Sequence, residues 1–310
     1  MTMHASSASP AGPPREGQAI TFFSDGLALA GDLFLPASSA PDSGYPGMVV
    51  AHGWGGIKKF FIQDIAAAFA AQGFASLAFD YRGFGESEGR RERLFPLEQV
   101  ADVRAATAWL SARPEVDAGR IAAYGTSFGG GIVLEAAAQD ERIKVAVCAV
   151  GVGDYGRWLR GLRPYWQWRE FLQRLRLDEI RRVTTGESEI VEPEEIMVRD
   201  PASLEHEAML RATYPDRAFK LTLESGDAVR AFAPVERVHL IAPRGTMFIG
   251  IEEDTLTPFD ETLDLYGRAG EPKRLLELRG LTHHEVYEPR HLYGVLEDVT
   301  GFCQDCMPGA

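Results

Sequence analysis

The hydrophobic positions of this chain follow two patterns that alternate along its length. Continuous apolar runs, typical of strands buried on both faces, occur at 48–51, 74–79, 121–124, 143–150, 246–251 and 274–278. Between them, apolar residues recur with helical spacing at about 62–72, 100–112, 259–268 and 292–303. Strands that alternate with helices in this way predict an α/β fold with a mostly parallel, doubly wound sheet.

Three segments depart from this alternation. Residues 18–23 and 27–35 flank the turn formers Ser24, Asp25 and Gly26 and predict an antiparallel N-terminal hairpin. Residues 152–235 hold an aromatic and arginine-rich stretch, an acidic stretch and further helical spacing, without a strand pattern. We therefore expect a helical cap at 152–235 inserted into a core of 18–151 and 236–310, after a flexible leader at 1–17 that is rich in Ser, Ala, Pro and Gly.

Composition excludes some classes of binding partner and indicates the cellular compartment. The formal net charge of −13 over 310 residues disfavours nucleic acid and anionic membranes as partners. No apolar run reaches the roughly 18 to 20 residues of a membrane span, and the N-terminus lacks the pattern of a secretion signal. Cys148, Cys303 and Cys306 have no further ligands at metal-binding spacing. We expect a cytoplasmic protein without a metal or an organic cofactor.

The segment 125–129 reads Gly-Thr-Ser-Phe-Gly and lies between a predicted strand and a predicted helix. A chain that turns from strand to helix within three residues forces the middle residue, Ser127, into a strained backbone conformation. Glycines on both sides let neighbouring backbone pass closely. This context predicts a serine hydroxyl raised above the sheet at the N-terminus of a helix.

A serine hydroxyl needs a base to remove its proton and an acid to orient that base. Ser127, Asp254 and His283 each follow a predicted strand, and parallel strands bring such positions to one edge of the sheet. Glu252 and Glu253 are alternative acids. His284 competes as base, but we expect its ring to pack beside the site.

Five motifs of this chain resemble those of a known protein superfamily, and the resemblance covers about residues 18–305. They are His-Gly-Trp-Gly-Gly at 52–56, Asp-Tyr-Arg-Gly-Phe-Gly-Glu-Ser at 80–87, Gly-Thr-Ser-Phe-Gly at 125–129, Asp-Thr-Leu-Thr-Pro at 254–258 and Gly-Leu-Thr-His-His-Glu-Val-Tyr at 280–287. The chain resembles the α/β-hydrolase superfamily, and within it the serine esterases similar to dienelactone hydrolases and to CocE- or prolyl-peptidase-like hydrolases.

This resemblance implies roles for particular residues. Ser127 would be the nucleophile, His283 the base and Asp254 the acid. The backbone N–H groups of Trp54 and Phe128 would form the oxyanion hole. The resemblance also makes His52 a residue that orients its loop, and Asp80 and Arg82 loop anchors.

We expect from these features a serine hydrolase that cleaves a small-molecule carboxylic ester through an acyl-serine intermediate. The same residues serve peptidases, thioesterases, lactonases, C–C hydrolases and acyltransferases, and a non-catalytic binding protein can keep the same fold. In the cap, an apolar lid is expected to form the substrate pocket, with Trp54, Trp158 and Trp166 in its walls. The sequence leaves a homodimer open.

Overall fold

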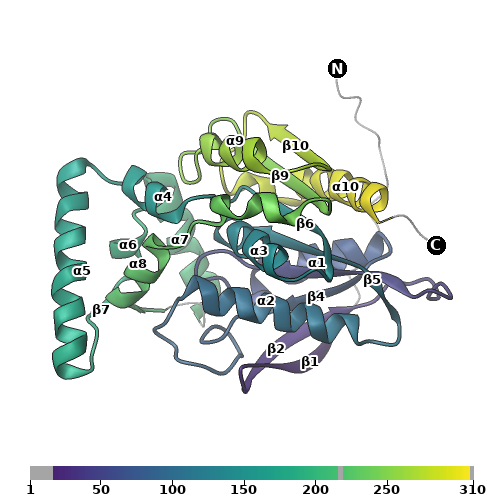
Figure 1. Ribbon diagram of the computed structural model, residues 1–310, viewed down its shortest axis with the longest axis horizontal. Helices are drawn as coiled ribbons and strands as arrows, with labels where there is room; N and C mark the ends of the chain where they lie inside the picture. The colour runs from purple at the N-terminus through teal and green to yellow at the C-terminus, as the bar shows by residue number, and fades with distance from the viewer. Residues whose placement is uncertain (1–16, 216–218, 308–310) are drawn as a thin grey trace.

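An eight-stranded sheet forms the centre of the structure, a computed structural model that describes residues 17–215 and 219–307 (Figure 1). Its strands are β1 (Gln18–Ser24), β2 (Leu27–Phe34), β3 (Tyr45–Ala51), β4 (Ala75–Phe79), β5 (Val116–Thr126), β6 (Ile143–Ala149), β9 (Gly245–Ile251) and β10 (Lys273–Leu278). Their order in the sheet is β1-β2-β4-β3-β5-β6-β9-β10. The expected leader falls almost wholly outside the described residues.

The pairing of the strands confirms the predicted sheet. β1 and β2 form the antiparallel hairpin, and β2 also runs antiparallel to β4. All further pairs, from β4 to β10, are parallel. Strands such as β4 and β9 are continuous apolar runs because helices cover both of their faces, whereas the edge strand β10 is only partly buried.

Helices cover the sheet in two layers. α1 (Gln63–Ala71) and α10 (Pro289–Cys306) pack on one face, and α2 (Pro96–Ser111), α3 (Phe128–Gln139) and α9 (Phe259–Arg268) pack on the other. In the described ranges, short helical turns lie in several connections, namely η1 (Lys58–Ile62), η3 (Pro234–Glu236), η4 (Val238–Ile241) and η5 (Glu285–Tyr287). Within the described residues, no helix is both long and apolar enough to cross a membrane.

The segment between β6 and β9 forms a separate group of helices at one end of the molecule (Figure 1). It contains α4 (Tyr155–Gly161), α5 (Tyr165–Thr185), α6 (Pro193–Ile196), α7 (Pro201–Thr213) and α8 (Leu223–Arg230). We call this group the cap. It also holds a small antiparallel pair of strands, β7 (Ile190–Val191) and β8 (Leu221–Thr222), so the expectation that the segment has no strand is wrong. Strands of two residues are too short to produce an alternating pattern.

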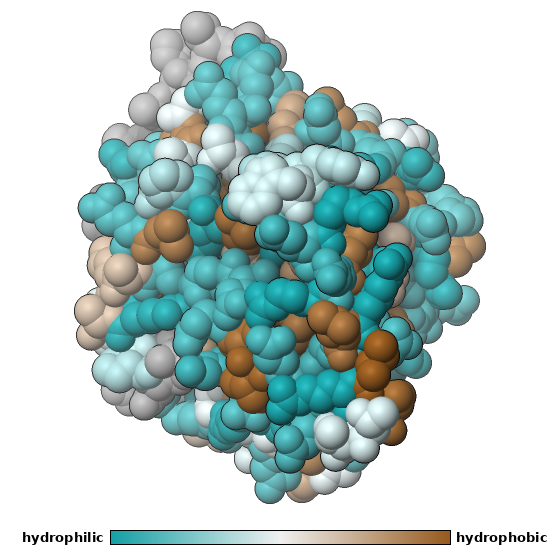
Figure 2. Space-filling view, turned by 90° about the vertical axis from the view of Figure 1, so that its left-hand side faces the viewer, coloured by the Kyte–Doolittle hydropathy of each residue, from teal (hydrophilic) through white to brown (hydrophobic). Residues whose placement is uncertain are grey.

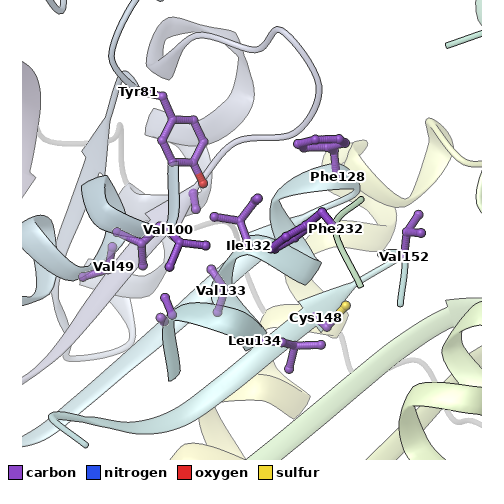
Figure 3. Close-up of a cluster of buried hydrophobic side chains, with 14 of the residues drawn as sticks. Val49, Tyr81, Val100, Phe128, Ile132, Val133, Leu134, Cys148, Val152 and Phe232 are labelled. Carbon is purple, nitrogen blue, oxygen red and sulfur yellow. The ribbon is translucent and has the colours of Figure 1, made fainter. Parts of the chain in front are cut away.

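The cap and the core share one hydrophobic cluster. Phe232 of the cap lies among the buried side chains of α3 and the adjoining strands (Figure 3). Tyr155 of α4 packs edge-on against Phe232 and against Phe128, at ring-centroid distances of 4.9 Å and 4.6 Å. This apolar packing holds α4, the first helix of the cap, against Phe128, the residue that follows Ser127.

A buried carboxylate provides a second attachment between the cap and the core. Glu261 of α9 accepts hydrogen bonds of 3.1 Å from the backbone N–H groups of Gly153 and Asp154, where the chain enters the cap. Arg157 of α4 donates two further bonds to the same carboxylate, at 2.6 Å and 2.8 Å. Because the ion pair also satisfies backbone donors, it fixes the direction in which the cap leaves the sheet.

The loop after β4 is anchored as expected from its motif. Asp80 accepts hydrogen bonds from the backbone N–H groups of Lys58 and Glu86, and burial raises the pKa of its carboxyl to about 6. Arg82 donates to the buried Asp102 through its side chain and its backbone N–H. These contacts hold the loop against the neighbouring segments. Asp80 and Arg82 therefore anchor the loop, and other residues form the site at the edge of the sheet.

Candidate active site

The turn between β5 and α3 has the strained conformation that its sequence predicts. Ser127 alone separates the strand from the helix, and its backbone has φ 51° and ψ −124°. A Cβ atom at Gly129 would lie 2.4 Å from the carbonyl oxygen of His52, and one at Gly125 would lie 2.2 Å from the carbonyl oxygen of Gly129. Only glycine therefore fits on either side of Ser127.

Three predicted residues meet at the carboxyl edge of the sheet. The Oγ atom of Ser127 lies 3.0 Å from Nε2 of His283. Nδ1 of His283 lies 2.7 Å from Oδ2 of Asp254. The serine follows β5, the aspartate follows β9 and the histidine follows β10, so strands far apart in sequence place the three side chains in one line. The arrangement is that of a nucleophile, a base and an orienting acid.

The surroundings of Asp254 favour its charged form. Burial by itself raises the pKa of this carboxyl, but the neighbouring His283 and the hydrogen bonds to Asp254 hold the pKa below its ordinary value. The backbone N–H groups of Leu256 and Thr257 donate to Oδ1 at 2.8 Å and 2.9 Å, and the Thr257 hydroxyl donates to Oδ2. Glu252 and Glu253 are exposed, so the geometry selects Asp254 among the three candidate acids.

The two residues predicted to form the oxyanion hole, Phe128 and Trp54, lie close to Ser127. Phe128 is the first residue of α3, a position at which the helical pattern supplies no acceptor for the N–H. The loop that carries Trp54 passes the nucleophile closely, because a Cβ atom at Gly53 would lie 3.2 Å from Cβ of Ser127. The Trp54 ring also packs edge-on against the Phe128 ring at 5.3 Å. The oxyanion role of these groups stays a prediction.

His52 holds this loop in place. Its Nδ1 donates to the carbonyl oxygen of Gly53 at 2.9 Å, and its Nε2 accepts a long hydrogen bond of 3.4 Å from the backbone N–H of Tyr81. The two contacts together require the neutral ring with its proton on Nδ1. The ring packs edge-on against the Tyr81 ring. These contacts agree with the predicted orienting role.

A cavity of about 280 Å³ opens above Ser127 between the core and the cap. Apolar side chains make up much of its wall, namely Trp54, Phe60, Phe61, Met197, Leu210 and Leu256. Arg199, His206 and Glu207 add polar groups from the cap side. Among the described residues, no group of three or more His, Cys, Asp and Glu is arranged to hold a metal ion.

Of the three tryptophans predicted for the pocket wall, Trp54 alone lines this cavity, and the prediction is wrong for Trp158 and Trp166. Trp158 is buried beneath the loop of the acid, where its Nε1 donates to the carbonyl oxygen of Leu256 at 2.7 Å. Trp166 is 60% exposed on α5. Trp166 lies outside the cavity because α5 buries Phe171 and Leu175, which are on the side of the helix opposite to Trp166.

A pair of stacked histidines forms part of the cavity wall. His206 of α7 stacks on His284 with ring centroids 3.9 Å apart, and His284 meets the ring of His283 edge-on at 5.2 Å. His284 thus packs beside the site, as expected. His206 packs on His284 and also lines the cavity. No sequence motif marks it, since its position depends on how α7 lies over the core.

A buried ion pair adds charged groups to the cavity wall. Arg199 and Glu207 approach to 3.1 Å, and both side chains are buried. Arg211 reaches the same carboxylate at 3.0 Å. No pattern in the sequence marks these residues for the cavity, because an arginine and a glutamate on a cap segment are typical of an exposed helix. Their mutual neutralisation leaves the cavity without a strong excess of either charge.

Comparisons with known proteins agree with this architecture. Residues 25–228 match the family model described as X-Pro dipeptidyl-peptidase (S15 family). An uncharacterized 31.7 kDa protein from the traX-finO intergenic region of Escherichia coli is 30% identical over 79% of this chain and 85% of its own length. A thiohydrolase from Eupenicillium brefeldianum is 29% identical over 84% of this chain and 85% of its own length.

A solved structure adds the fold. The α/β hydrolase GrgF from Penicillium sp. sh18 superposes with a TM-score of 0.78, at 24% identity, over 94% of this chain and 99% of its own. The predicted α/β-hydrolase fold is therefore confirmed.

His284 makes the stability of the protein depend on pH. Burial and the neighbouring histidines lower the pKa of its imidazole from 6.5 to about 3 in the folded state. As the pH falls below 6.5, the unfolded chain takes up the proton first, so stability is lost on acidification. Between pH 6.5 and 5, wild type should lose about 2 kcal/mol more unfolding free energy than His284→Gln, measured by urea denaturation at each pH. Equal losses in the two proteins would contradict this.

Proposed function

Because this chain belongs to the X-Pro dipeptidyl-peptidase (S15) family and is a hydrolase with the α/β-hydrolase fold, we propose that it cleaves carboxylic esters through an acyl-serine intermediate. The observation that carries the proposal is the line of Ser127, His283 and Asp254, with contacts of 3.0 Å and 2.7 Å. The apolar cavity directly above the serine supports an uncharged acyl or aryl group as the part of the substrate that is bound there.

The contacts define a role for each group in this reaction. His283 Nε2 takes the proton of the Ser127 hydroxyl while Oγ attacks the ester carbonyl, and the C–O bond to the alcohol then breaks. The same nitrogen passes its proton to the departing alkoxide. It next removes a proton from water, which attacks the acyl-serine. The bond between the acyl carbon and Ser127 Oγ then breaks, Nε2 returns the proton to Oγ, and the acid is released. Asp254 keeps the Nδ1 proton in place and stabilises the charged imidazole throughout.

Negative charge on the carbonyl oxygen develops close to the start of α3. The backbone N–H of Phe128 is the natural donor there, because it is the first N–H of the helix and is backed by the positive end of the helix dipole. The N–H of Trp54 would supply the second hydrogen bond. Both are backbone groups held by glycine-lined turns, so they need no rearrangement as the charge forms.

The cavity gives less support to the release of dipeptides from the N-terminus of a peptide, the activity that the family description names. A peptidase that releases a dipeptide must bind the free ammonium of its substrate, and this requires an available carboxylate. Both carboxylates among the described residues that line the cavity already pair with arginines, Glu207 with Arg199 and Arg211, and Glu288 with Arg290. An ester substrate without a charged amino group fits this wall better.

The activated serine is tested by labelling. A fluorophosphonate should add one phosphonyl group to wild type, detected by intact mass, because His283 makes the Ser127 hydroxyl nucleophilic. Ser127→Ala should take up no label and should lose turnover of p-nitrophenyl esters by about 10⁴-fold or more. Folded wild type that takes up no label would overturn the proposed mechanism and favour a binding protein.

The acid is tested with a matched pair of variants. Asp254→Asn should lower ester turnover by about 10³- to 10⁴-fold, because the amide no longer holds the Nδ1 proton of His283. Glu253→Gln, an exposed neighbour in the same loop, should leave turnover unchanged. Comparable losses in both variants would mean that the loop as a whole, and not the Asp254 carboxylate, supports the reaction.

Thioester hydrolysis is a second candidate, supported by the relative named thiohydrolase and by the same apolar cavity. A thiolate leaves without protonation, so a thioester depends less than an alkyl ester on proton donation by His283. Paired substrates with one acyl group, as an ethyl ester and as a thioethyl ester, separate the two activities. For an ester hydrolase we expect kcat/KM of the ethyl ester to equal or exceed that of the thioester. A large excess for the thioester would replace the ester proposal.

A further inference from the structure

The long helix of the cap has two faces of different character. α5 buries Phe171 and Leu175 against the rest of the cap. On the opposite side, Trp166, Leu177 and Ile180 are 60%, 58% and 58% exposed. Spacings of eleven and three residues place these three side chains on one side of the helix. Single exposed apolar residues are common, whereas a row of them along one helix marks an interaction surface.

The position of α5 leaves this row accessible. The helix stands at the outer edge of the cap, at the end of the molecule farthest from α10 (Figure 1). Figure 2 views this end directly and shows hydrophobic side chains gathered toward its lower part, among hydrophilic ones. The exposed residues Tyr165 and Val183 extend the surface at the two ends of the helix. We call the row of Trp166, Leu177 and Ile180 the outer stripe.

Polar residues interrupt the outer stripe in its middle. Glu170 and Gln173 lie on the same side of α5, between Trp166 and Leu177, and are exposed. Insertion into a membrane surface would remove water from a carboxylate and an amide without replacing their hydrogen bonds. The formal net charge of −13 adds repulsion from anionic lipid. These features favour a protein partner that offers polar groups at the centre and apolar groups at the ends.

A second copy of the same helix, running in the opposite direction, has this pattern. We propose that α5 pairs antiparallel with α5 of a second copy of this chain about a two-fold axis near Gln173. Trp166 of each copy then lies level with Ile180 of the other, seven residues from the axis on either side. The two Gln173 amides meet at the axis, where they can hydrogen-bond to each other.

Charge complementarity supports the same direction. The carboxylate of Glu170 is in the N-terminal half of α5, and the C-terminal half carries the exposed Arg176 and Arg181. Across the described part of the chain, neither Glu170 nor Arg176 forms an ion pair. An antiparallel partner brings Glu170 of one copy level with Arg176 of the other, three residues from the axis on either side. A parallel partner would place the arginines beside arginines.

Sedimentation equilibrium over a range of protein concentrations tests the pairing. Wild type should be a dimer, and Leu177→Glu/Ile180→Glu should raise the dimer dissociation constant at least about 100-fold, because it buries carboxylates in the contact. Leu97→Glu is the matched control, an exposed leucine on α2 at 64%, and should dimerise like wild type. Circular dichroism should show all three proteins folded, since the substituted side chains are exposed.

A cysteine at the axis tests the direction of the helices. Gln173→Cys should be cross-linked between copies by a short bis-maleimide, while Thr184→Cys, far from the axis, should not. A wild type that is monomeric at every concentration would overturn the proposal, and so would a dimer that survives the double substitution. Co-sedimentation of monomeric wild type with vesicles of anionic lipid would assign the outer stripe to a membrane surface instead.

Discussion

The close passage of two backbone segments over the nucleophile is the constraint on which the site depends. The carbonyl oxygen of His52 lies 2.4 Å from the place that a Cβ atom at Gly129 would take, and a Cβ atom at Gly53 would lie 3.2 Å from Cβ of Ser127. This proximity packs the loop that carries Trp54 directly against the turn that carries Ser127. A bulkier residue at either glycine would push the two segments apart and displace the nucleophile.

The acid and the base depend on the sheet in a different way. Asp254 and His283 come from loops after β9 and β10, and their meeting with Ser127 requires these strands to lie in register with β5 across β6. Backbone N–H groups of the acid loop then hold the carboxylate, so its charge is satisfied before a substrate arrives. The parallel pairing of the strands and the hydrogen bonds within the acid loop therefore together place Ser127, His283 and Asp254 for proton transfer.

The cap turns an open sheet edge into an enclosed site. Glu261 and Arg157 direct the chain into the cap, and Tyr155 packs its first helix against the core beside the nucleophile. From this base, α7 carries His206 over the cavity to the ring of His284. The cap thus supplies one wall of the pocket, while its outermost helix presents a separate surface to solvent.

Sequence alone determined the features that depend on local patterns. The apolar runs predicted the strands, and Ser127, Asp254 and His283 were found because each follows a strand within a short, recognisable turn. Tertiary structure decided the rest. The burial of Trp158, the exposure of Trp166 and the approach of His206 to the cavity depend on how cap helices rotate and pack, which involves residues far away in the chain. An amphipathic pattern shows that a helix has a buried face, but it does not show which surface that face will cover.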